Sequence, residues 1–194
     1  MKQRRTVQKR LSEIIEYLDV TRARLLDSVS RVNPAFAEIR PGDKAWSVAE
    51  ILTHLALVEA GVAKLVARSV LWGKEKGVGP ETSEESVLSS LDGSPIAEPA
   101  RPMTAPERVV PPHDCRMSEA LRSLASSRRA LTDAFLEGDG MDLSVITRPH
   151  VILGELNLYQ WGVFIGKHEA RHTRQIERTL HELTEGAAES APIF

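Results

Sequence analysis

The sequence contains a single cysteine, Cys115, so no disulfide can form within the chain. No apolar run approaches the roughly 18 residues that a membrane-spanning helix needs. The N-terminus also lacks the apolar segment of a secretory signal peptide. These absences predict a cytoplasmic protein. A nucleophilic role for Cys115 would require an activating partner that we cannot place, so we interpret it as a structural or surface residue.

Neither sign of charge dominates, because 25 Lys and Arg residues stand against 27 Asp and Glu residues, giving a net charge of -2. This balance gives no support to nucleic-acid binding, and we interpret the basic residues 2–10 as a solvated helix end. We therefore expect neither nucleic acid nor membrane as a partner. With 194 residues, 42% of them hydrophobic, the chain is long enough for one domain with a core, predicted to span 1–194.

Apolar residues recur at helical spacing in four segments, and we find no convincing strand alternation. The helices are expected at about 6–32, 48–71, 118–136 and 158–183. Four amphipathic helices of this length can close around one core. The predicted fold is therefore an all-α four-helix bundle, with residues 187–194 as a frayed tail.

Several residues predict helix ends. Ser47 and Glu50 have the spacing of a capping box at the start of the second helix, and Asn157 and Gln160 repeat it at the start of the fourth. Ser118 is the candidate cap of the third helix.

The connections differ in character from the helices. Seven of the eleven prolines lie between residues 77 and 112, where proline removes backbone donors and blocks helix interiors. We predict one long excursion over the bundle here, beginning after a stop at Gly73, with a short helix at 84–91. Residues 142–155 are expected to form a simple connecting loop.

The letters H-E-A-R-H at residues 168–172 place two histidines four residues apart, one above the other on the same helix face. Trp161 and Phe164 fall on the same side of this helix, so His168 and His172 should point inward; we interpret both aromatic residues as core. Such a pair can hold a metal ion, but hydrogen bonds alone can also satisfy two interior histidines. The spacing by itself does not decide between these readings.

His54 strengthens the metal hypothesis. It lies two turns into the second helix, at the rim of the apolar stripe. A third imidazole at similar depth on a neighbouring helix would complete a set of three nitrogen donors, the arrangement of a catalytic zinc site with one open position. Imidazole also suits nickel, iron and copper, so the ligand type does not fix the metal.

Two further residues are weaker catalytic candidates. Glu169 would be the general base of a His-Glu-x-x-His metalloprotease. It lies about 100° round the helix from His168, so it can flank the site only if that edge faces a cleft. His150 precedes the fourth helix and could contact a substrate. Gln175 could face the cavity or the solvent.

Residues 46–56, W-S-V-A-E-I-L-T-H-L-A, resemble the second-helix motif of the DinB-like (DinB/YfiT) superfamily, a Trp-Ser start followed by Glu and a His-Leu pair. Residues 154–158, G-E-L-N-L, and 168–176, H-E-A-R-H-T-R-Q-I, are similar to the last helix of that family. The matches occur in order and the resemblance covers most of the chain, although 77–112 matches no family motif.

The resemblance implies a four-helix bundle, often a homodimer, with a divalent metal ion bound by His54, His168 and His172. It implies a metal-dependent hydrolase, or a transferase that joins a low-molecular-weight thiol to an electrophile, acting on a small-molecule substrate. The alternative is a non-catalytic metal-binding or interaction bundle. Zinc or nickel is the first expectation for the metal, with iron or manganese next.

Overall fold

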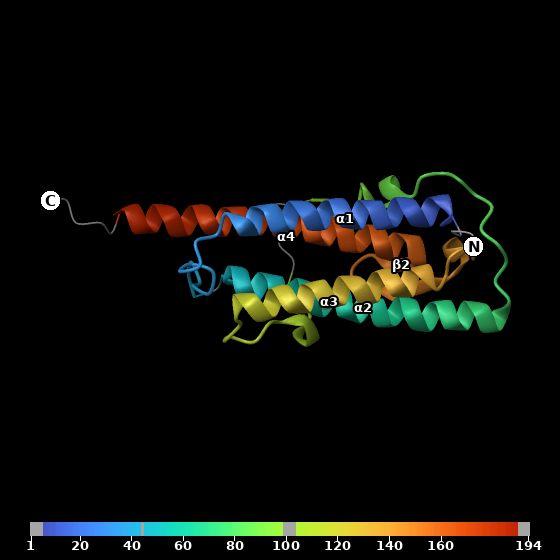
Figure 1. Ribbon diagram of the computed structural model, residues 1–194, viewed down its shortest axis with the longest axis horizontal. Coiled ribbons are helices and arrows are strands. Elements are labelled where there is room, and N and C mark those ends of the chain that lie inside the picture. Colours follow the sequence, from blue (N-terminus) through green and yellow to red (C-terminus); the bar gives the residue numbers. More distant parts are fainter. Residues whose placement is uncertain (1–5, 44, 99–103, 190–194) are drawn as a thin grey trace, which may run out of the picture.

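A computed structural model describes residues 6–43, 45–98 and 104–189 of the chain. Most of them belong to four long helices: α1 (Lys9–Ser30), α2 (Val48–Lys76), α3 (Met117–Leu136) and α4 (Leu158–Glu189). Figure 1 shows these helices side by side along one long axis, which confirms the predicted four-helix bundle. Within the described residues, no helix combines the length and hydropathy needed to cross a membrane.

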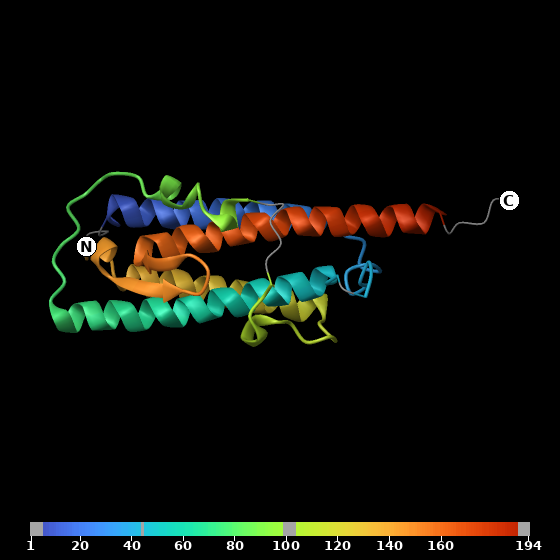
Figure 2. The ribbon, with the colours of Figure 1, turned by 180° about the vertical axis from the view of Figure 1, so that it is seen from behind.

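The helices pack mainly as two pairs, α1 with α4 and α2 with α3 (Figures 1 and 2). The members of each pair run in the same direction, so the chain leaving α2 must return along the bundle before α3 can begin. The 29 residues of α2 span about 44 Å. The described part of the returning segment contains three short 3-10 helices: η1 (Leu88–Leu91) and η2 (Pro95–Ala97), which contact α4, and η3 (Glu107–Val109), which contacts α2.

Two predicted capping boxes are present. The Ser47 hydroxyl accepts from the Glu50 amide, and Glu50 accepts from the Ser47 amide in return. Asn157 and Gln160 make the equivalent pair of hydrogen bonds at the start of α4. The prediction of Ser118 as a cap is wrong, because α3 has already begun one residue earlier.

The predicted stop of α2 at Gly73 is also wrong. The helix continues to Lys76 and ends at Gly77, whose positive φ of 68° is the left-handed conformation typical of a glycine C-cap. Gly73 instead allows close packing, since a Cβ there would lie 2.7 Å from Ile146 Cδ1 and 2.8 Å from Met141 Sδ.

Other boundaries also differ. The first helix begins at residue 9 instead of 6, because the Gln8 side chain accepts from the amides of residues 10 and 11 and caps it there. Only 88–91 of the predicted helix 84–91 is helical, and as a 3-10 turn. The fourth helix includes residues 187–189 of the predicted frayed tail; residues 190–194 lie outside the described chain.

A β-hairpin replaces the loop expected at 142–155. Its strands are β1 (Thr147–His150) and β2 (Gly154–Asn157), paired antiparallel so that Thr147 faces Asn157 and His150 faces Gly154. Gly154 has a φ of 75°, which closes the turn between the strands. The expectation of no strands was therefore wrong, and the hairpin fixes where His150 lies relative to α4.

The apolar core is divided into two clusters along the bundle. One cluster lies toward the start of α1 and α4, and the other lies toward the opposite end. The first includes Leu11, Ile14, Val66, Leu131, Phe135 and Tyr159. The second includes Leu25, Ile51, Leu52, Leu124 and Ile176. Both clusters draw side chains from all four helices, so each holds the two helix pairs together.

Charged residues lie between the two clusters in sequence on every helix. Arg22 of α1, Glu59 of α2, Arg128 of α3 and Glu169 of α4 form a closed ring that we call the ion layer. Each arginine contacts both glutamates, with nitrogen–oxygen distances from 2.6 to 3.0 Å. The ring carries no net formal charge, and the ion pairs offset the free-energy cost of removing its charged groups from water.

Hydroxyl groups complete the ion layer. Thr21 donates to Glu169 at 2.7 Å and Ser127 donates to Glu59 at 2.6 Å. Burial alone would lower the pKa of Arg128, but the carboxylates of Glu169 and Glu59 raise it above its ordinary value. The arginine therefore stays charged inside the bundle.

The α1–α4 pair approaches closely at Gly166. A Cβ at this position would lie 2.1 Å from Cε1 of Tyr17 on α1, closer than any real contact. A Gly166→Ala variant is therefore expected to lower the free energy of unfolding by about 1–3 kcal/mol, measured by urea denaturation. Gly61→Ala is the control, because nothing lies within 4 Å of a Cβ there. An equal loss in both variants would contradict a packing role for Gly166.

Candidate metal centre

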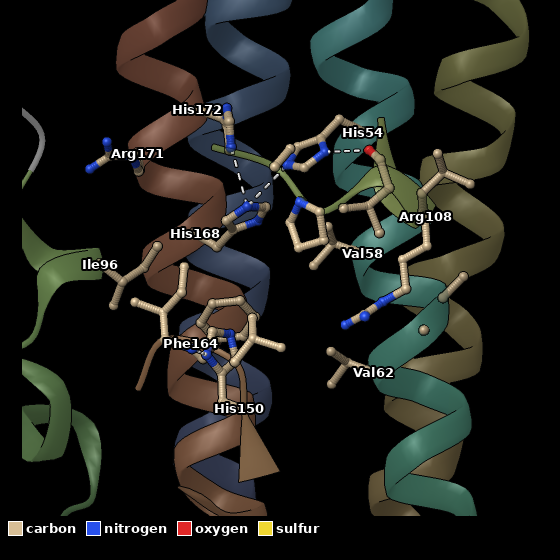
Figure 3. A pocket seen from close by; sticks show the side chains of 18 of the residues that line it. His54, Val58, Val62, Ile96, Arg108, His150, Phe164, His168, Arg171 and His172 are labelled. Carbon is tan, nitrogen blue, oxygen red and sulfur yellow. Dashed lines mark hydrogen bonds between the residues drawn. The ribbon is translucent and has the colours of Figure 1, made fainter. Parts of the chain in front are cut away.

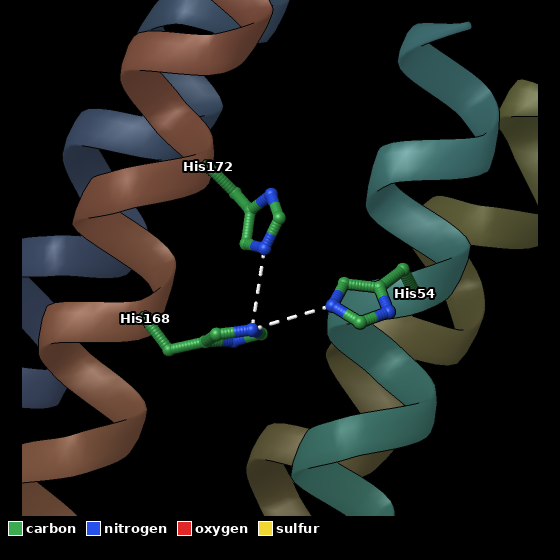
Figure 4. Close-up of side chains that lie close together, drawn as sticks. All are labelled: His54, His168 and His172. Carbon is green, nitrogen blue, oxygen red and sulfur yellow. Dashed lines mark hydrogen bonds between the residues drawn. The ribbon is translucent and has the colours of Figure 1, made fainter. Parts of the chain in front are cut away.

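Three histidines face one another across the space between α2 and α4 (Figure 4). The Nε2 atom of His168 lies 3.3 Å from that of His54 and 3.2 Å from that of His172. One nitrogen from each side chain falls within a group no wider than 4.8 Å. The helical spacing of His168 and His172 stacks them on one face of α4, and α2 presents His54 opposite them. The structure thus brings together the three histidines that we predicted from the sequence as metal ligands.

Two hydrogen bonds orient the outer rings of this cluster. Nδ1 of His54 lies 2.7 Å from the backbone oxygen of Val109, and Nδ1 of His172 lies 2.7 Å from Oε1 of Gln175. Because these oxygens only accept, each Nδ1 carries the proton in its neutral ring. The Nε2 lone pairs of His54 and His172 are then both directed toward His168, as in zinc sites where an outer partner fixes the tautomer.

This arrangement fits a cation better than a set of hydrogen bonds. Nε2 of His168 carries at most one proton, so it can satisfy only one of the two lone pairs that face it. A tetrahedral ion with metal–nitrogen bonds of about 2.0–2.1 Å keeps its ligands roughly 3.3 Å apart. Two of the three spacings, 3.2 and 3.3 Å, agree with that value, and the third, between His54 and His172, lies within 4.8 Å. The residues present therefore fit a divalent metal ion.

Burial keeps all three imidazoles neutral. It lowers the pKa of His54 and, together with the neighbouring histidines, holds the pKa of His168 well below its ordinary range. Burial and the neighbouring His54 lower the pKa of His172 to about 3. Neutral imidazole is the form that binds a metal, so these rings are ready to bind at neutral pH.

The lowered pKa of His172 predicts how the metal-free protein responds to acid. Its folded pKa of about 3 lies below the ordinary 6.5, so the unfolded chain binds a proton first as pH falls. The contribution of His172 to the free energy of unfolding is therefore fully present above pH 6.5. It is lost as the pH falls toward 3, at up to about 1.4 kcal/mol per pH unit. The free energy of unfolding would be measured by urea titration at several pH values in the presence of a chelator. It should fall less steeply with decreasing pH in His172→Gln than in the wild type. His113→Gln, a change at an exposed histidine, is the control and should keep the pH dependence of the wild type. The same pH dependence of stability in wild type and His172→Gln would contradict the expectation.

The histidine cluster lines a cavity of about 760 Å³, within the size range of small-molecule sites. Figure 3 shows His54, His168 and His172 together on one side of this space, with Val58, Val62 and Phe164 along it. Trp161 and Phe164, which we interpreted as core, also line the cavity, and so does Trp46. Trp161 and Phe164 are nevertheless well buried, at 6% and 5% exposure.

The two weaker catalytic candidates lie in different places. His150 lines the cavity but is not one of the clustered ligands; its ring packs 4.6 Å from Phe164, between centroids. Burial, and then the charge of Arg108, lower the pKa of His150. Glu169 lies in the ion layer, where Thr21 and both arginines bind its carboxylate, and it does not line the cavity. Its edge of α4 faces the bundle interior, so the cleft that a general base would need is absent there.

Two groups at this site were not predicted from the sequence. The Val109 carbonyl that holds His54 comes from η3, in a segment with no family motif, and backbone groups leave no sequence pattern. Arg108, the preceding residue, lines the same cavity. Gln175, for which the sequence allows either the cavity or the solvent, lines the cavity and is hydrogen-bonded to His172.

The fold and the site together define a mainly helical four-helix bundle with a three-histidine cluster beside a cavity. The chain belongs to the DinB superfamily, whose sequence profile matches residues 17–176. It is 26% identical over 148 residues to the uncharacterized protein YuaE of Bacillus subtilis (strain 168), covering 74% of this chain and 83% of YuaE. It is similar in structure to TT2238, a four-helix bundle protein, with a TM-score of 0.56 and 21% identity over 87% of this chain and 98% of that one. The resemblance found in the sequence is thereby confirmed, and the likeness to TT2238 supports the fold alone.

Proposed function

We propose that this chain is a metal-dependent enzyme that binds one divalent ion through Nε2 of His54, His168 and His172 and acts on a small molecule. One observation carries the proposal. The three nitrogens converge, two of them with their protons held on the far side of the ring, at the wall of a cavity large enough for a substrate.

The donor set supports zinc or nickel as the metal. Three neutral imidazoles and no described carboxylate in the cluster suit zinc, nickel or iron. Manganese, which prefers oxygen ligands, is a less favoured alternative. A divalent ion held here would act as a Lewis acid and supply a nucleophile from water or a thiol near neutral pH.

The residues of the chain have separate roles in this proposal. Val109 and Gln175 hold the protons of His54 and His172 away from the shared point, so both rings stay oriented as ligands. Trp161 and Phe164 form an apolar wall that limits water around a bound substrate. A purely structural metal site would need a closed ligand set, and the adjoining cavity supports the catalytic alternative.

Hydrolysis and thiol transfer are distinguished by the co-substrate. Tag-free protein reconstituted with zinc or nickel would be assayed with 4-nitrophenyl acetate alone, and with 1-chloro-2,4-dinitrobenzene plus cysteine. Turnover that needs the metal and the thiol supports a transferase, whereas turnover in water alone supports a hydrolase. Stoichiometric metal binding without turnover of a broad ester and electrophile panel would favour the non-catalytic bundle. Cytoplasmic location and homodimer formation stay predictions.

The partner of His172 gives a more selective test. A Gln175→Leu variant is expected to weaken metal binding about 10–100-fold, because the His172 ring loses the group that fixes its tautomer. Competition with a chelating dye would measure the affinity. Arg174→Ala, an exposed change one residue away, is the control and should bind like the wild type. Unchanged affinity in Gln175→Leu would remove the orienting role.

A further inference from the structure

The charge of the cavity lining has one sign. Lys64, Arg108 and Arg171 line the cavity, and no Asp or Glu is among the described residues that do so. A divalent cation at the histidine cluster would add to the same sign. Such a cavity attracts anions. It disfavours cationic ligands, because no carboxylate among the described lining residues could pair with a ligand's positive charge.

Arg108 is the best placed of these cations. Figure 3 shows its side chain extending into the space between His150 and Val62. No ion pair or hydrogen bond to another described residue holds the guanidinium, so its donors are available to a ligand. Arg171 differs, because its Nη1 already donates to the backbone oxygen of Glu98 at 2.5 Å.

The remaining wall of the cavity is apolar. The apolar lining comes from Val58 and Val62 of α2, Trp161 and Phe164 of α4, and Ile96 of η2. The lining therefore offers a hydrocarbon and aromatic surface for the body of a ligand, with the Arg108 cation on one side and the histidine cluster on another. Pockets of this kind bind by apolar area and select by a few polar groups.

We infer that the substrate is an apolar small molecule bearing an oxyanion group, carboxylate or phosphate, which Arg108 binds while the histidine cluster faces the reacting atom. This inference rests on the proposed function. The planar guanidinium matches either oxyanion with two parallel hydrogen bonds. The same short segment holds both Arg108 and the Val109 carbonyl that orients His54, so the anion-binding group and the ligand sphere share one support.

Matched ligands test the inference without an activity assay. Calorimetric titrations would compare 3-phenylpropanoate with its amide, and phenyl phosphate with phenol, using metal-loaded and chelator-treated protein. At least one anion is expected to bind about 10-fold more tightly than its neutral match, and Arg108→Gln should remove most of that difference. Arg24→Gln, an equal charge change on α1, which supplies none of the described lining residues, should have no effect.

Each outcome has a separate meaning. Equal binding of anions and neutral matches, or an anion preference that survives Arg108→Gln, would overturn the inference. A preference that survives this substitution but disappears with the chelator would place the anion on the metal and leave the proposed function standing. An Arg108-dependent preference in a protein that binds no metal would support the inference and refute the proposed function. Circular dichroism would establish that both variants are folded.

Discussion

A His168→Ala variant is expected to lose stoichiometric binding of zinc or nickel while the bundle stays folded. His168 is the central member of the cluster, because the Nε2 atoms of His54 and His172 both lie within 3.3 Å of its own. Its removal leaves two ligands on separate helices. The loss of affinity should exceed the roughly 10–100-fold that removal of an outer partner causes. Elemental analysis of tag-free protein, after equilibration with a defined metal concentration, measures the effect.

Two other histidines provide controls for this experiment. His113 is exposed in a loop, and His150 lines the cavity outside the cluster. Replacement of either by alanine should leave one metal ion per chain. Full occupancy in His168→Ala would refute the ligand assignment, and equal loss in His150→Ala would show that the cluster is larger than three residues. His54→Ala separately tests the link between α2 and α4.

The second large effect concerns the ion layer. A Glu59→Ala variant is expected to lower the free energy of unfolding by about 3–5 kcal/mol, because it leaves Arg22 and Arg128 short of a partner inside the bundle. The Glu59 side chain is only 3% exposed, so water cannot replace the lost carboxylate. Chemical denaturation of the metal-free protein would measure this change apart from any effect of metal binding.

A charge removed from the surface should behave differently. Lys9→Ala deletes an exposed ion pair with Glu84, whose side chains are 66% and 76% exposed, and should change stability little. Glu59→Gln keeps the side-chain shape and should fall between the wild type and Glu59→Ala. If Glu59→Ala were no less stable than Lys9→Ala, the ion layer would have no part in holding the helices together.

The helices and the histidine cluster could be predicted from the sequence because their causes are mostly local. Apolar periodicity, the Ser47–Glu50 pair and the i, i+4 histidines each depend on residues within one or two helical turns. His54 could be included because it lies on the rim of an apolar stripe, and the family resemblance groups it with the two histidines of α4. The geometry of the cluster then followed from the packing of two helices.

The ion layer was not predicted because its pairs are distant in sequence. Arg22 and Glu169 are separated by 147 residues, and Arg128 and Glu59 by 69. A single charged residue beside an apolar stripe has the same pattern as one on a solvated helix edge, so no window of sequence distinguishes them.

The hairpin and the Val109 hydrogen bond escaped prediction for a different reason. β1 and β2 have four residues each, and one residue of β1 is Pro149, which normally argues against a strand. The carbonyl of Val109 is a backbone group, present at every position of the chain. Its contact with His54 depends on where a long segment lies on the bundle, which tertiary packing decides.

The ion layer also limits how the helices can slide along one another. In a layer of leucines, a shift of one helical turn, about 5.4 Å, changes the free energy of packing less, because one aliphatic side chain can take the place of the next. The same shift of α4 against α2 and α3 would carry Glu169 away from Arg128 and leave both charges unpaired among hydrocarbon side chains. His168 adjoins Glu169, and His54 precedes Glu59 by little more than one turn. The ion layer thus fixes the lengthwise alignment of α2 and α4 that places the three imidazoles opposite one another, without contacting the imidazoles itself.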